Sequence, residues 1–167
     1  MTMRRFVKES RIAAPPAEVF RFFERPDAFE RLIPPGEDVE VVLPPRSLEV
    51  GTRVVLRARI GPVPVEWVVE HVEYVPGRLF VDRQVRGPFA SWTHRHEFDD
   101  DGRGGTILRD VVDYAPPLGL IGALVGGPLL GSRLAKLFDH RHEAVRRAFE
   151  SPGRDALPGR TTKDPEA

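Results

Sequence analysis

The sequence predicts one α+β domain, in which a curved antiparallel sheet of about seven strands wraps around one long C-terminal helix, with two short helices after the first strand. Three observations favour this architecture. Strand-like runs joined by short turn sequences fill most of residues 39–114, as is typical of antiparallel neighbours. After them the apolar spacing changes to three and four, which indicates a helix. The length of 167 residues suits a single domain with a sizeable core.

The first strand and the helical pair come from the N-terminal part of the chain. Residues 3–13 alternate between two faces, and Pro15-Pro16 ends the alternation. Pro16 suits the first turn of a helix, and the apolar residues that follow it have helical spacing. A second short helix begins at Pro26-Asp27 and stops at Pro34-Pro35-Gly36.

Six further strands follow, separated by proline, glycine and aspartate turns. Because the connections are of hairpin length, each strand is expected to pair with the next one in one curved sheet. The predicted strands are residues 39–43, 52–60, 63–74, 78–86, 89–98 and 106–114.

The last predicted element is a long amphipathic helix. Its apolar stripe needs a surface to cover, and the concave face of the sheet is the large one available. The stripe consists of Leu129, Leu130, Leu134, Leu137, Phe138, Val145, Ala148 and Phe149. We therefore expect one folded domain over residues 1–150, and we expect residues 151–167, which lack periodicity, to form a disordered tail.

This order of elements resembles the helix-grip fold of the SRPBCC superfamily, also called START or Bet v 1-like, over about residues 3–150. The local motifs are residues 14–20 (APPAEVF), 80–84 (FVDRQ), 87–89 (GPF) and 92–98 (WTHRHEF), followed by Asp110 and residues 114–116. The segment 80–98 is similar to an uncharacterised branch that also occurs beside sugar-nucleotide-epimerase-like domains. The resemblance implies a cavity between the sheet and the long helix that takes lipids, sterols, polyketides, plant hormones or aromatic metabolites. Some members catalyse cyclisation or dehydration, and no universal catalytic residue is carried over.

Composition and charge exclude several other classes. Lys+Arg 25 balance Asp+Glu 25, so we expect no nucleic-acid partner. The chain has no cysteine, which removes thiolate and disulfide chemistry. No signal peptide is visible, so a cytoplasmic location is expected. The uncharged run between Tyr114 and Arg133 contains several prolines and glycines, which argues against stable membrane insertion. We interpret the glycines of 119–131 as a flexible entrance to the cavity.

Strand alternation gathers polar side chains on the predicted inner face. Trp92, His94, His96 and Phe98 share one face of their strand. If the neighbouring strands turn the same way, they add Asp82 and Gln84 on one side and Asp110 and Tyr114 on the other.

Three interpretations of this polar patch remain open. It is a satisfied hydrogen-bond network, a set of groups that orient a ligand, or a site of chemistry. In the last case His94, His96 and Asp110 are the catalytic residues of an acid–base reaction. A His-x-His pair with a carboxylate also suits zinc or iron, with His71 as a conceivable third histidine, but the sequence favours no metal and no cofactor.

Together these features predict a protein that binds or transports a small hydrophobic or aromatic metabolite, such as a lipid or polyketide, as a monomer or weak dimer. The alternatives are a polyketide cyclase/dehydrase-like enzyme and an accessory interaction module. The predicted ligand-binding residues are Trp67, Phe80, Asp82, Gln84, Trp92, His94, His96, Asp110, Tyr114 and Phe138.

Overall fold

The computed structural model describes residues 2–60, 62–116 and 128–150. Its core element is one antiparallel sheet of seven strands in the order β1-β7-β6-β5-β4-β3-β2, so the predicted fold class is confirmed. The strands are β1 (Arg4–Ile12), β2 (Val39–Leu43), β3 (Arg53–Ile60), β4 (Val63–Val75), β5 (Leu79–Arg86), β6 (Ser91–Asp100) and β7 (Thr106–Ala115). The helices are α1 (Pro16–Phe23), α2 (Ala28–Arg31) and α4 (Pro128–Glu150).

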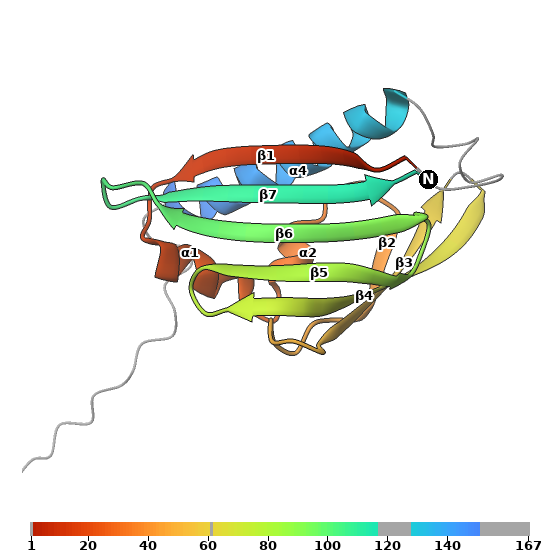
Figure 1. Ribbon diagram of the computed structural model, residues 1–167, viewed down its shortest axis with the longest axis horizontal. Helices are drawn as coiled ribbons and strands as arrows, with labels where there is room; N and C mark the ends of the chain where they lie inside the picture. Colours follow the sequence, from red (N-terminus) through yellow and green to blue (C-terminus); the bar gives the residue numbers. More distant parts are fainter. Residues whose placement is uncertain (1, 61, 117–127, 151–167) are drawn as a thin grey trace, which may run out of the picture.

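The helices lie on one face of the sheet, and α4 runs along β1 and β7 (Figure 1). The Phe6 ring of β1 lies 5.2 Å from the Phe138 ring of α4, and Lys8 pairs with Asp139. Alternation explains this packing, because residues 6, 8, 10 and 12 of β1 are the more buried set. From Leu130 onward, the apolar stripe of α4 therefore covers the inner face of the sheet, as its spacing predicts.

One end of this inner face is closed by aromatic packing. The rings of Phe20 and Phe23 on α1 each lie 5.1 Å from Phe98 of β6, in edge-to-face contact. Phe80 of β5 adds a third ring beside Phe98. Edge-to-face pairs are favoured beyond their buried area, so this end forms a packed core.

Strand β6 begins two residues later than the spacing predicts. The Gln84 amide donates to the Phe89 carbonyl oxygen at 2.8 Å, and the Phe89 N–H donates to the Gln84 Oε1 at 3.3 Å. Because a side chain satisfies both backbone groups of Phe89, this residue belongs to the turn and not to the sheet ladder.

Two predictions concern residues outside the described ranges. The proposed tail, 151–167, lies wholly outside them, and so do residues 117–127 of the glycine-rich segment. Within residues 2–60, 62–116 and 128–150, no helix is long and apolar enough to cross a membrane.

Candidate functional site

A cavity of about 590 Å³ opens between the inner face of β3–β6, the α2 region and α4. Its walls are mainly apolar and aromatic, with polar groups contributed by β3–β6, by α4 and by the segment before β2. The side chains that define it include Leu32, Val54, Leu56, Trp67, Val69, Phe80, Trp92, Leu134, Phe138, Asp82, His71, His94, His96 and Arg141.

The structure brings most of the predicted ligand-binding residues to this cavity. Those in its lining are Trp67, Phe80, Asp82, Trp92, His94, His96 and Phe138. The other three lie outside the lining. Gln84 holds the turn at Phe89, Tyr114 packs near Trp92, and Asp110 lies behind the two histidines. These three side chains therefore support the wall of the cavity.

Asp110 of β7 is the centre of a buried hydrogen-bond network. Its Oδ1 lies 2.9 Å from the Nε2 of His94, and its Oδ2 lies 2.8 Å from the Nε2 of His142 on α4. The His96 Nδ1 is also 2.9 Å from Oδ1, but its angle falls outside that of a hydrogen bond. Asp110 thereby fixes one ring nitrogen of His94 and ties the sheet to α4.

Sequence reasoning missed His142. The available signal was its helical position, four residues after Phe138 and three before Val145, which are both fully buried. A histidine in the apolar stripe of a helix needs a polar partner in the sheet that the stripe covers. Asp110 is that partner.

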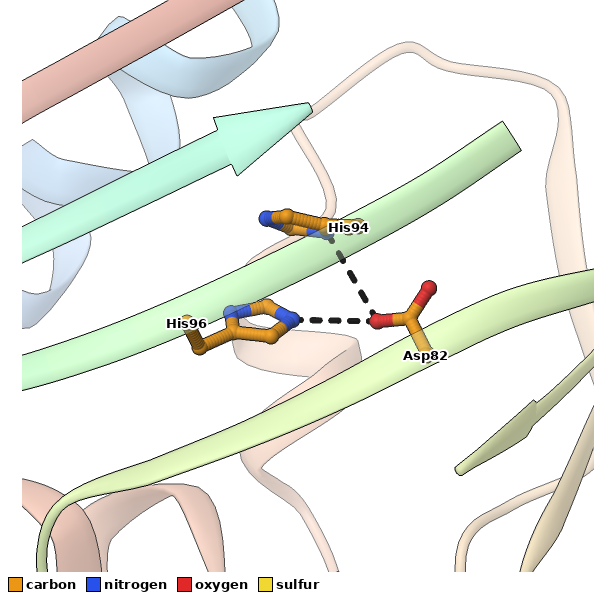
Figure 2. Close-up of side chains that lie close together, drawn as sticks. All are labelled: Asp82, His94 and His96. Atoms are coloured by element: carbon orange, nitrogen blue, oxygen red, sulfur yellow. Dashed lines mark hydrogen bonds and ion pairs between the residues drawn. The ribbon is translucent and has the colours of Figure 1, made fainter. Parts of the chain in front are cut away.

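On the cavity side, the two histidines of β6 turn toward Asp82 of β5 (Figure 2). The Asp82 Oδ2 lies 3.0 Å from the His96 Nε2 and 3.7 Å from the His94 Nδ1. The two imidazole rings have centroids 3.7 Å apart. Among the described residues, this trio is the group whose geometry suits a metal ion.

Burial and charge act against each other in this cluster. Burial alone would raise the pKa of Asp110, but the positive charge of protonated His94 and His96 and the hydrogen bond from His142 hold it well below its ordinary value. Burial lowers the pKa of His94. For His96 burial acts in the same direction, but Asp110 and Asp82 outweigh it and its pKa is raised.

His71 of β4 joins the same wall. It stands opposite Asp82 in the β4–β5 register, beside an irregularity between His71 and Glu73. Its side chain is buried, and its Nδ1 has no hydrogen-bond partner among the described residues. Burial lowers its pKa. The sequence alone left the face of His71 open, because the bulge interrupts the alternation.

Arg141 of α4 contributes a cation to the lining of the cavity, beside two aromatic rings. Its guanidinium carbon lies 5.6 Å from the Phe138 ring centroid and 6.0 Å from that of Phe29. Within the described part of the chain, no carboxylate forms an ion pair with it. Burial lowers its pKa, and Asp110 and Asp82 oppose that effect. From the sequence, only the position of Arg141 on the predicted helix could have indicated that it lines the cavity.

A seven-stranded sheet gripping a long helix, with a cavity between them, defines a helix-grip protein. Over residues 3–150 the chain matches the family described as polyketide cyclase/dehydrase and lipid transport, and it belongs to that family. No curated protein sequence matches it significantly.

Solved structures agree with this fold. A protein from Thermus thermophilus is 22% identical with a TM-score of 0.63, over 87% of this chain and 99% of that chain. The Zhui aromatase/cyclase from Streptomyces sp. R1128 is 19% identical with a TM-score of 0.68, over 89% of this chain and 94% of that one. A nucleoside-diphosphate sugar epimerase from Corynebacterium glutamicum is 22% identical with a TM-score of 0.69, over 87% of this chain but 29% of its own.

Proposed function

We propose that this protein binds a small hydrophobic or aromatic molecule in the cavity between the sheet and α4. The observation that carries the proposal is the cavity itself, which has about 590 Å³ of space and mainly apolar walls. Small-molecule sites have volumes of roughly 300–1,000 Å³ and combine apolar walls with a few polar groups that fix orientation.

The aromatic wall favours a flat ligand. Trp67 and Trp92 meet edge to face with centroids 5.1 Å apart, and Phe89 adjoins both. Trp67 and Trp92 both line the cavity, and indole rings offer stacking and edge-to-face contacts to an aromatic guest. The buried Trp67 Nε1 has no acceptor among the described residues, so an oxygen of the ligand is a suitable partner for it.

The polar wall would orient the ligand. Asp82, His94 and His96 come from adjacent strands and are held by one another, and Arg141 faces the same space from α4. A fixed set of donors and acceptors at one side of an apolar pocket gives a bound molecule one preferred orientation. The family and the fold support such binding in general terms.

A cyclase/dehydrase-like reaction on the bound molecule remains the alternative. In it, His94 and His96 would contact the substrate, because both line the cavity. Asp110 would be a positioning residue, since it lies behind His94 and outside the lining.

Binding can be tested with the neutral fluorescent probe N-phenyl-1-naphthylamine. The chain has two tryptophans, Trp67 and Trp92, and both line the cavity, so energy transfer from tryptophan to the probe reports occupancy directly. The informative variant is Ala58→Phe, which places a ring into the cavity from β3. Val55→Phe is the matched control, because Val55 lies on the same strand and is not in the cavity lining, whereas Val54, Leu56 and Ala58 are.

We expect saturable binding to the wild type and to Val55→Phe, and at least tenfold weaker binding to Ala58→Phe. Circular dichroism and thermal unfolding establish that each variant is folded. If the wild type bound no probe, or if Ala58→Phe bound it as tightly as Val55→Phe, the cavity would not be the binding site.

A further inference from the structure

Three potential metal ligands converge at the polar wall of the cavity. They are the Nδ1 of His94, the Nε2 of His96 and the Oδ2 of Asp82, which lie within 4.8 Å of one another (Figure 2). The carboxylate oxygen is 3.0 Å from one nitrogen and 3.7 Å from the other. Ligand atoms on a tetrahedral zinc ion are about 3.4 Å apart, given bonds of about 2.1 Å, so these separations need little adjustment.

A carboxylate stands behind both histidines. The Nε2 of His94 and the Nδ1 of His96, which are the ring nitrogens turned away from Asp82, each lie 2.9 Å from the Oδ1 of Asp110. His142 holds the other oxygen of Asp110 at 2.8 Å. A metal-ligating histidine almost always gives its second N–H to a carboxylate, a backbone carbonyl or a water molecule, which fixes the tautomer and the direction of the ring. This support is in place for His94, whereas His96 has only a close contact with Asp110 whose angle is not that of a hydrogen bond.

Hydrogen-bond accounting also leaves room for a cation. When neutral His94 donates to Asp110, its Nδ1 is a lone-pair acceptor that faces the Asp82 carboxylate at 3.7 Å. Neutral His96 has one N–H for two carboxylate contacts, and either a proton or a metal ion on its second nitrogen would satisfy the other contact. A cation between Asp82 and the two rings would satisfy the contacts of both histidines.

The charge balance points in the same direction. Asp82 and Asp110 bring two negative charges into a nearly solvent-free region, with side chains 13% and 3% exposed. Among the described residues, their ion-pair partners are imidazoles, and no lysine or arginine pairs with either. Buried charges without full compensation are unfavourable. With neutral imidazoles, the single charge of Arg141, on which both carboxylates act, leaves one negative charge that a bound metal ion would offset.

We propose that Asp82, His94 and His96 bind a divalent first-row transition metal ion, with Asp110 as the residue that positions His94. Two imidazoles and one carboxylate are a donor set that suits Zn²⁺ and Fe²⁺. All three ligands line the cavity while Asp110 does not, so the remaining coordination positions face the space proposed for the organic ligand. Metal binding does not depend on that ligand and can be tested without it.

The sequence favoured no metal because His94 and His96 lie on one strand and the position of the third histidine, His71, could not be predicted. The structure replaces the missing histidine with Asp82 from the neighbouring strand. It also places His142 with Asp110 as support, although its spacing from His140 on the helix excludes a metal site shared by those two residues.

The test uses the 167-residue chain without a histidine tag, stripped with EDTA and freed of the chelator. Zn²⁺ is titrated by calorimetry, and Co²⁺ is followed by its visible d–d absorption, which reports the coordination geometry. Asp82→Asn removes one ligand charge with little change in shape, and Asp110→Asn removes the positioning group. His140→Gln is the matched control, because His140 is the one described histidine outside the buried cluster.

We expect one Zn²⁺ per wild-type chain, binding at least tenfold weaker in Asp82→Asn, and about 10–100-fold weaker binding in Asp110→Asn. His140→Gln should bind like the wild type. The proposal is overturned if the wild type binds no metal saturably, or if His140→Gln alone loses it. If Asp82→Asn does not fold, anomalous scattering from wild-type crystals soaked in Zn²⁺ locates the bound metal ion instead. A peak between Asp82, His94 and His96 supports the site, and a peak only elsewhere refutes it.

Discussion

Adjacent residues of β7 make ionic contacts of equal length on opposite faces of the sheet. Arg109 on the outer face lies 2.9 Å from Glu97, with side chains 33% and 24% exposed. Asp110 on the inner face lies 2.9 Å from His94, with side chains 3% and 6% exposed. The same strands therefore hold similar pairs in two very different dielectric environments.

The two environments change what an ion pair contributes to the stability of the fold. Exposed pairs are screened by water and salt and contribute about 0–1 kcal/mol. Buried pairs must overcome the desolvation of both groups, and an apolar replacement is often as stable. A buried polar cluster facing a cavity is thus poorly explained by stability alone, which favours a functional role for the inner face.

The largest effect is expected from Asp110→Ala. This change leaves His94 and His142 without their acceptor and removes the charge that balances His96, so we expect the free energy of unfolding to fall by about 3–5 kcal/mol. Urea denaturation monitored by circular dichroism measures it. A loss below about 1 kcal/mol would mean that the inner cluster is no more important than the outer pairs.

A smaller effect is expected from His142→Leu. The substitution keeps the apolar contacts of α4 but leaves one oxygen of Asp110 without a donor, which costs about 1–3 kcal/mol. His140→Leu, on the half-exposed side of the same helix, is the control and should change stability by less than about 0.5 kcal/mol. Equal losses from both variants in the same denaturation assay would show that Asp110 gains nothing from His142.

The smallest effect is expected from Arg109→Gln on the outer face. Arg109 contacts Glu9, Glu97 and Asp99, so its loss leaves three carboxylates near one another in water. We expect at most about 1 kcal/mol at low salt, and less at about 0.5 M salt because screening weakens both attraction and repulsion. Paired urea curves at the two salt concentrations test this. A large loss that salt does not reduce would contradict the contrast between the faces.

The fold was predictable because its signals are local. Alternation and turn residues set the strands, and the three-and-four spacing set α4, whose stripe covers the inner face as expected. The predicted start of β6 was wrong by two residues because the Gln84 side chain hydrogen-bonds to the backbone of Phe89. Sequence periodicity does not encode this contact.

The site was predictable only in part. Alternation along β6 correctly placed His94 and His96 on the inner face, and the register of β5 brought Asp82 to them. It could not show that Asp110 lies behind the histidines, since depth within a face depends on rotamers. Nor could it find His142 and Arg141, because their places depend on how α4 is rotated and docked against the sheet.

Binding inside the cavity is tested most directly by native mass spectrometry of the protein mixed with N-phenyl-1-naphthylamine. We predict a one-to-one adduct with the wild type and with Val55→Phe, and a strongly reduced adduct with Ala58→Phe. No adduct on the wild type, or equal adducts on all three proteins, would contradict a binding site between the sheet and α4.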